Sequence, residues 1–261
     1  MDALLREIAK WAAARDDVHA AVLVGSQART ETPADEFSDT DVVLFVDDPT
    51  PYVGSGAWLE AFGQPLLTFI EGTATGGQLE RRVLFDSGLD VDFALVPTTA
   101  VPQLLSDPET ARVIARGFRI LYDELDLAER FAGVEPAATT PDLERLSHDV
   151  WYHLLLAAKK LRRGEVYYAK QMCDCYLKSR VVALLHVRYP GPWHDGRFLE
   201  RWAPADVLLA LEESYATYNA AAVGTALRAT AALFARLERE LGIDAVDHEG
   251  VRRRLEEVLA A

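Results

Sequence analysis

The sequence predicts an α+β chain in which a mixed sheet with flanking helices is followed by a bundle of helices. In the first half, apolar runs of strand length alternate with turn residues. Residues 132–141, AGVEPAATTP, are mostly small and include two prolines, which is typical of a linker. Beyond them, apolar residues recur at helical spacing over long stretches. We therefore expect two domains, residues 1–134 and 135–261.

The elements of the first half follow from hydrophobic periodicity. Residues 2–15 carry apolar positions at helical spacing and predict a helix. Two β-rich runs within residues 80–96 flank Asp86-Ser87-Gly88, which predicts a hairpin. Short apolar runs bounded by turn residues predict the other strands, and we expect the sheet to be mostly buried. These strands are residues 19–24, 41–46, 66–70 and 118–122.

The second half shows helical periods interrupted by helix-stopping residues. Gly164 separates two long periods, because glycine commonly follows the end of a helix. The segment Tyr189-Pro190-Gly191-Pro192 predicts a loop. The predicted helices are residues 142–163, 165–188, 195–202, one starting near Pro204, and 217–241.

Composition and charge narrow the class of ligand. The chain has 261 residues, with 27 Lys and Arg against 41 Asp and Glu, and a formal net charge of -14. That excess of acidic residues argues against a general nucleic-acid binder, because binding to phosphate backbones requires clustered Lys and Arg. It is compatible with a cationic ligand, which an acidic cleft would concentrate. Taken alone, the charge favours a simpler explanation, a surface that is acidic for solubility.

The cysteines and the N-terminus bear on the cellular compartment. Cys173 and Cys175 are too close in sequence to form a normal disulfide, which favours a reduced, cytosolic chain with both thiols buried on a helix. Two thiols without a second cluster are a poor case for zinc. The N-terminus lacks a signal-peptide core, and no run approaches 18 uncharged apolar residues, so we expect a cytoplasmic protein without a membrane span.

The segment Gly25-Ser26 closes the first predicted strand. Glycine lets the backbone approach a ligand closely, and N–H groups of such a turn can bind phosphate oxygens. If a helix begins near Gln27, its N-terminus adds positive potential there. The hydroxyl of Ser26 can donate one more hydrogen bond.

Three aspartates form the second part of the pattern. Asp39 and Asp41 stand two residues apart at a strand start, so their side chains face the same way. Asp92 lies inside a later strand and joins them if that strand neighbours the strand of Asp41. Three converging carboxylates are costly without a cation, and Mg²⁺ prefers oxygen ligands of this kind. A D-x-D pair alone also occurs by chance as a capped turn, but the whole pattern predicts a metal–nucleotide site.

The pattern resembles the nucleotidyltransferase superfamily with the DNA polymerase β-like fold. AVLVGSQAR, FSDTDVVLFVDD, GQPLLTFIEG and GLDVDFALVP look like strands of the aminoglycoside 6-adenylyltransferases, also called streptomycin adenylyltransferases. In the second half, DVWYHLLLAAKKLRRGEVYYAKQM is similar to their tryptophan-bearing helix and Y-A-K segment. The resemblance covers roughly the whole chain.

The resemblance implies transfer of AMP from ATP to a hydroxyl of an aminoglycoside antibiotic, with release of pyrophosphate. Asp39, Asp41 and Asp92 would bind Mg²⁺. Ser26 beside Gly25 would hold the terminal phosphates, and Lys170 would reach the triphosphate. Residues 1–134 would be the catalytic domain and residues 135–261 the substrate-binding domain.

Two roles near this site stay open. Arg29 either touches phosphate or caps the loop. The family places a Glu before an aromatic pair, where this chain has Asp149, a shorter acid that either takes the acceptor proton or binds a substrate ammonium. Asp92 is the competing base, because a carboxylate beside the reacting hydroxyl can accept its proton.

The histidines and aromatic residues of the second half, and the function of the whole chain, also have alternative interpretations. His148 and His153 are expected to be packed or solvated, and the aromatic residues to lie in the core, although one could stack on adenine or a sugar ring. Those aromatic residues are Trp151, Tyr152, Tyr167 and Tyr168. The same chemistry could serve a different small-molecule or protein acceptor, or the chain could be a catalytically silent nucleotide-binding regulator.

Overall fold

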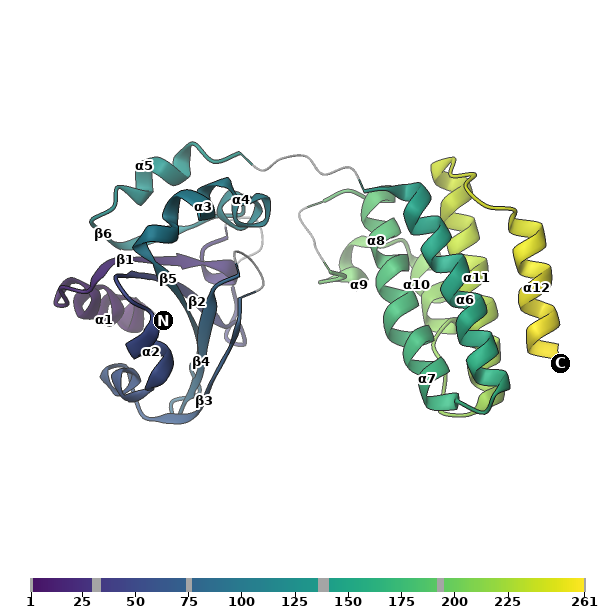
Figure 1. Cartoon of the computed structure of the whole chain (residues 1–261), viewed down its shortest axis with the longest axis horizontal. Helices are drawn as coiled ribbons and strands as arrows, with labels where there is room; N and C mark the ends of the chain where they lie inside the picture. Colours follow the sequence, from purple (N-terminus) through teal and green to yellow (C-terminus); the bar gives the residue numbers. More distant parts are fainter. Residues whose placement is uncertain (1, 30–33, 74–76, 136–140, 192–194, 261) are drawn as a thin grey trace. The chain divides into compact units, whose positions relative to one another are not determined.

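The computed structural model describes residues 2–29, 34–73, 77–135, 141–191 and 195–260. These residues divide into two compact units, Met1–Thr139 and Thr140–Ala261, which Figure 1 draws as a ribbon coloured along the sequence. Half of the predicted linker, residues 136–140, lies outside the described residues, as does residue 192 of the predicted loop. Each unit is described by itself below.

The first unit contains a six-stranded sheet among its described residues, in the order β3-β4-β5-β2-β1-β6. β2 and β5 run parallel, and the other neighbouring strands pair antiparallel. The sheet is therefore mixed, and the predicted α+β class is confirmed. The strands are β1 Val18–Val24, β2 Thr40–Val46, β3 Pro65–Gly72, β4 Leu79–Phe85, β5 Asp90–Pro97 and β6 Arg119–Asp123.

Side chains of the central strands alternate between two apolar clusters, one on each face of the sheet. Val42 and Leu44 of β2 belong to the cluster covered by α1 Asp2–Ala13. Phe45 belongs to the other cluster, which is covered by α3 Val101–Ser106, α4 Pro108–Ala115 and α5 Leu127–Ala132. Helices thus cover both faces of the sheet.

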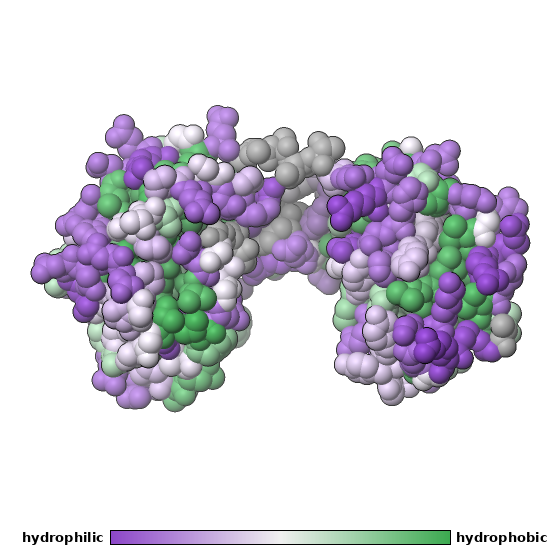
Figure 2. All heavy atoms as spheres, in the orientation of Figure 1, coloured by the Kyte–Doolittle hydropathy of each residue, from purple (hydrophilic) through white to green (hydrophobic). Residues whose placement is uncertain are grey.

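Edge strand β3 departs from the expectation of a mostly buried sheet. Leu66, Leu67 and Phe69 are 65%, 52% and 47% exposed. β3 pairs only with β4 among the described strands, because it lies at the end of the sheet. Figure 2 shows apolar surface gathered over the region where β3 and β4 lie.

Several short helices of the first unit were not predicted. Each is too short to show a helical hydrophobic period. Three of them carry a proline at the first or second helical position. They are α2 Thr50–Gly54, α3 Val101–Ser106, α4 Pro108–Ala115 and α5 Leu127–Ala132.

The second unit is a helical bundle, as predicted. α6 begins after Asp142, whose side chain accepts a hydrogen bond from the backbone N–H of Arg145 and so caps the helix. The predicted helix 165–188 is continuous but contains a π-helical segment, Met172–Leu177. The C-terminal α12 was not predicted. The helices are α6 Leu143–Arg162, α7 Val166–Gln171, α8 Lys178–Arg188, α9 Leu199–Trp202, α10 Ala205–Glu213, α11 Ala220–Leu241 and α12 His248–Ala260.

One helix and one cysteine of this unit bear on the sequence expectations. α11 is long and apolar enough to cross a membrane by length and composition, although it is not an uncharged run, and more than half of its most apolar window is buried in the bundle. Such burial is what a core helix requires. Cys173 is buried as expected, whereas Cys175 is exposed because it faces away from the bundle core.

Candidate active site

Sheet register brings the central aspartates together. Asp41, the second residue of β2, pairs with Val24 at the end of β1 on one side and with Asp92 of β5 on the other. Directly paired residues on neighbouring strands point to the same face of the sheet. Alternate residues of a strand share a face, so Asp41 lies on the same face as Phe45. Helices α3, α4 and α5 cover that face of the sheet.

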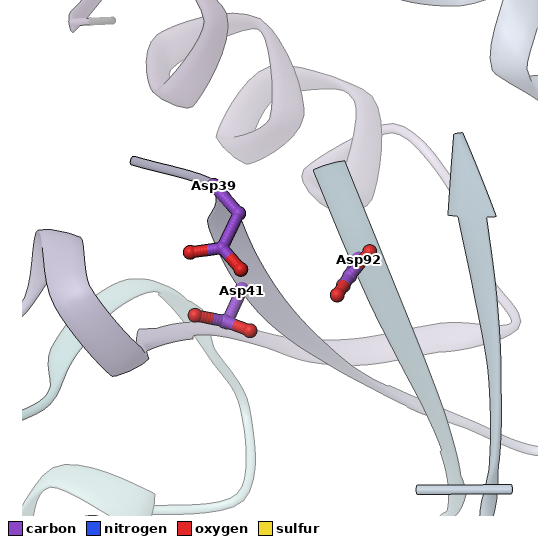
Figure 3. A group of neighbouring side chains, drawn as sticks. All are labelled: Asp39, Asp41 and Asp92. Carbon is purple, nitrogen blue, oxygen red and sulfur yellow. The ribbon is translucent and has the colours of Figure 1, made fainter. Parts of the chain in front are cut away.

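The three aspartates form a cluster with the geometry of a metal site. Asp39, Asp41 and Asp92 each offer a carboxylate oxygen, and these oxygens all lie within 4.8 Å of one another. Figure 3 shows Asp39 immediately before β2, Asp41 on β2 and Asp92 on the adjacent strand. Carboxylate oxygens are the ligands that Mg²⁺ prefers, so the donor set fits a hard divalent cation.

The turn that follows β1 closes against this cluster. Gly25 has a φ of +66°, and a Cβ atom added to it would lie 1.8 Å from the Oδ2 atom of Asp41. Glycine is therefore required both by backbone conformation and by the space that the Asp41 carboxylate occupies. The Ser26 hydroxyl donates to the backbone oxygen of Asp39 at 3.2 Å and lies 3.4 Å from its Oδ1 atom.

The helix considered near Gln27 is only a single 3-10 turn, Gly25–Gln27. Among the described residues of this turn there is no α-helical N-terminus, so Gly25–Gln27 adds no helix dipole to the site. Phosphate binding at the turn would depend on local N–H groups and on Ser26.

Burial and crowding of like charges raise the pKa of two of the aspartates. Desolvation raises the pKa of Asp41 to about 6, and the charges of Asp39 and Glu80 add to the effect. Desolvation raises the pKa of Asp92 to about 7, although Arg82 opposes the rise. A cation bound between the carboxylates would oppose both shifts, because an opposite charge favours the ionised form.

Two arginines lie near the cluster. The charge of Arg29 lowers the pKa of Asp41, which places Arg29 within electrostatic range of the site. Arg82 of β4 pairs with Asp92 in the sheet, and its Nη2 atom lies 3.3 Å from Asp92 Oδ2.

Arg82 was missed by the sequence reasoning, although a signal for it exists. The hairpin turn at Asp86-Ser87-Gly88 makes Leu84 pair with Asp90 and Arg82 pair with Asp92. Counting the same number of residues away from the turn along each strand would have placed Arg82 directly beside Asp92.

Asp149 belongs to the second unit and is engaged by neighbours there. Both of its carboxylate oxygens lie 2.8 Å from the Tyr176 hydroxyl, which can donate to one of them, and Arg180 Nε donates to Oδ2 at 3.1 Å. His153 Nδ1 lies 3.2 Å from Oδ1. His148, by contrast, is exposed and its Nε2 lies 3.0 Å from the Ala245 carbonyl oxygen, whereas His153 is partly buried, which agrees with the expectation of packed or solvated histidines.

Lys170 is also in the second unit and has partners of its own. Its Nζ atom donates to the Asp174 carboxylate and, at 2.7 Å, to the Ala216 carbonyl oxygen. The ion pair with Asp174 raises the pKa of Lys170, so the side chain is charged.

The tyrosines of the second unit correct the expectation of a core position. Tyr152, Tyr167 and Tyr168 are 65%, 64% and 47% exposed, because they lie on outward faces of α6 and α7. Trp151 is buried as expected, and its Nε1 donates to the buried carboxylate of Glu238 at 3.0 Å.

Comparisons with solved structures give distant similarities. The crystal structure of an aminoglycoside 6-adenyltransferase from Bacillus subtilis is 16% identical, with 99% of this chain and 98% of that chain covered and a TM-score of 0.41. A nucleotidyltransferase-like protein from Exiguobacterium sibiricum 255-15 is 15% identical, with 100% and 87% covered and a TM-score of 0.37. No curated protein matches the chain.

The family comparison covers nearly the whole chain, including Gly25, Ser26 and all three aspartates. Because residues 1–245 match the streptomycin adenylyltransferase family, the chain belongs to that family and is a nucleotidyltransferase enzyme.

Proposed function

We propose that the enzyme transfers AMP from ATP to a hydroxyl group of a streptomycin-like aminoglycoside in a Mg²⁺-dependent reaction that releases pyrophosphate. The observation that carries the proposal is the convergence of Asp39, Asp41 and Asp92 beside the Gly25-Ser26 turn, in a chain of this family. The formal charge of -14 agrees with a polycationic acceptor.

The three aspartates would hold Mg²⁺, which would neutralise charge on the triphosphate and on the leaving pyrophosphate. The fit rests on the oxygen donors of the three side chains, which all lie within 4.8 Å of one another. Deprotonated carboxylates are needed for binding, so we expect metal affinity to increase as the pH rises through 6 to 7.

Other residues would hold the nucleotide. The Ser26 hydroxyl and the backbone of Gly25 would contact the terminal phosphates, and Arg29 would add positive charge beside them. Lys170 would reach the triphosphate from the second unit by exchanging the Asp174 carboxylate for a phosphate oxygen. Residues 1–134 would thus form the catalytic domain, and residues 135–261 the helical domain that binds the substrate.

In the reaction, a bond forms between the acceptor oxygen and the α-phosphorus of ATP, and the bond from that phosphorus to the bridging oxygen of pyrophosphate breaks. The acceptor proton passes to a carboxylate. We assign this role to Asp92, because a carboxylate beside the reacting hydroxyl can accept its proton. Asp149, already contacted by Tyr176 and Arg180, would bind a substrate ammonium and is the alternative base.

The proposal is tested by AMP transfer from α-labelled ATP to streptomycin in the presence of Mg²⁺. Asp41→Asn should abolish transfer while the protein remains folded. Asp86→Asn, a change of the same chemistry on the exposed β4–β5 turn, should leave transfer intact. Retained turnover in Asp41→Asn would contradict the assignment.

A panel of other hydroxyl acceptors, read by pyrophosphate release, defines the substrate. Release with another sugar, a lincosamide or a protein but not with streptomycin would keep the chemistry and change the acceptor. ATP binding that is indifferent to Mg²⁺, with no turnover on any acceptor, would identify a catalytically silent regulator. We expect the protein to act in the cytoplasm, where ATP is available.

A further inference from the structure

Arg82 lies in the same row of the sheet as the aspartate cluster. The pairing of β4 with β5 sets Arg82 opposite Asp92, and the pairing of β5 with β2 sets Asp92 opposite Asp41. All three side chains therefore project from one face, in line across three neighbouring strands. Arg82 Nη2 contacts Oδ2 of Asp92 at 3.3 Å.

The guanidinium group of Arg82 is itself held by two glutamates. Its Nε lies 2.5 Å from Glu71 Oε1 and 3.0 Å from Glu80 Oε1, and its Nη2 is 3.0 Å from the same Glu80 oxygen. Glu71 and Glu80 pair directly across β3 and β4, so both carboxylates come from rigid strands. An arginine held in this way presents Nη2 to Asp92 in a fixed direction.

We propose that Arg82 is a positioning residue that holds the Asp92 carboxylate in the orientation required to bind the divalent ion. By contacting Oδ2 at 3.3 Å, Arg82 restricts rotation of the Asp92 carboxylate beside the cluster. The inference rests on the proposed function, because it concerns the same metal site.

Arg82 could affect metal binding in two opposite directions. Its positive charge repels a cation, whereas its ion pair with Asp92 orients a ligand. Glu71 and Glu80 contribute two negative charges against the one of Arg82, so the group as a whole does not repel a cation. Orientation therefore dominates, and removal of Arg82 should weaken metal binding. Loss of a group that orients a metal ligand typically costs about 10- to 100-fold in affinity.

The test is Mn²⁺ binding by the full chain with a non-hydrolysable ATP analogue, measured from the free Mn²⁺ signal in electron paramagnetic resonance. Arg82→Met removes the charge and the donors, and Arg82→Lys keeps the charge but cannot bridge Asp92 and the glutamates. Arg119→Met is the matched control, because Arg119 is an exposed strand arginine that pairs with Leu23, whose side chain packs on the opposite face of the sheet.

We expect Arg82→Met to bind Mn²⁺ at least about tenfold more weakly, Arg82→Lys to recover only part of the loss, and Arg119→Met to match the wild type. In the transfer assay, the KM for Mg²⁺ should rise more than kcat falls. If Arg82→Met does not fold, as judged by its thermal midpoint, Arg82→Lys decides the question with the same expected direction.

The outcomes separate this inference from the proposed function. Wild-type binding of Mn²⁺ with equal or tighter binding by Arg82→Met overturns the positioning role and leaves the metal site standing. Full recovery by Arg82→Lys also overturns it, because charge alone would then suffice. Failure of the wild type to bind Mn²⁺ would overturn the metal site and the inference with it.

Discussion

Substitution of Gly25 by alanine tests whether the turn after β1 must stay free of side chains. The added Cβ would lie 1.8 Å from Asp41 Oδ2 and 2.6 Å from Asp41 Cγ, so the turn or the carboxylate has to move. The φ of +66° adds a conformational cost of about 1–2 kcal/mol for a residue with a Cβ. Overpacking adds about 1–3 kcal/mol more.

Gly88→Ala separates the two effects. Gly88 also has a positive φ, +82°, but no described atom lies within 4 Å of the position that an added Cβ would take. It should therefore show the conformational cost alone. Urea unfolding should show Gly25→Ala to be less stable than Gly88→Ala by about 1–3 kcal/mol.

Activity should separate the variants further. A displacement of about 1 Å at a reacting site can cost about 100-fold in rate, so Gly25→Ala should lose about that much kcat/KM for AMP transfer, while Gly88→Ala stays near the wild type. If the Asp41 side chain of Gly25→Ala moves away and relieves the clash, the free energy of unfolding recovers, but the rate of AMP transfer does not. Equal transfer rates for the two alanine variants would refute the proposed closeness of the turn and the metal site.

Three further predictions address pH, the helical unit and the nucleotide. In metal-free protein, the free energy of unfolding should fall as the pH rises from 3.8 towards 7, because the raised pKa values of Asp41 and Asp92 mean that the folded state keeps protons which the unfolded chain has lost. Urea midpoints in EDTA should show a smaller fall for Asp92→Asn, and an unchanged pH dependence would contradict the raised pKa. Trp151→Phe should cost about 1–3 kcal/mol in urea unfolding, because it removes the 3.0 Å hydrogen bond to the buried Glu238, and should leave AMP transfer unchanged. Lys170→Gln should raise the KM for ATP by about tenfold or more in steady-state kinetics through loss of a charge-assisted contact, whereas an unchanged KM would exclude Lys170 from the nucleotide site.

The sheet core was predictable because its strands are short, apolar and bounded by turn residues. Val42, Leu44 and Phe45 are buried on both faces of β2, and such strands appear in the sequence as continuous apolar runs. The cluster was predictable because Asp39 and Asp41 stand at the spacing of one strand face and Asp92 lies within a predicted strand. The sequence did not specify that β2 and β5 are neighbours, and only that pairing closes the cluster.

The remaining features depend on contacts that no local pattern contains. Helices α3 and α4 are stabilised by packing of Val101 and Ile114 onto the sheet rather than by a visible helical period. The exposure of Tyr152 depends on which helices surround α6, since an aromatic residue at helical spacing suits either a core or a surface position. The ion pair between Arg82 and Asp92 depends on hairpin register, which the turn residues specify only indirectly.

The central claim is that Asp39, Asp41 and Asp92 together bind a divalent ion beside the nucleotide. A crystal structure with Mn²⁺ and a non-hydrolysable ATP analogue tests it directly, because Mn²⁺ scatters anomalously. We predict an anomalous peak about 2.0–2.3 Å from carboxylate oxygens of these aspartates, with the triphosphate against the Gly25-Ser26 turn. A nucleotide bound with its phosphates elsewhere, or a peak that none of the three carboxylates contacts, would contradict the account.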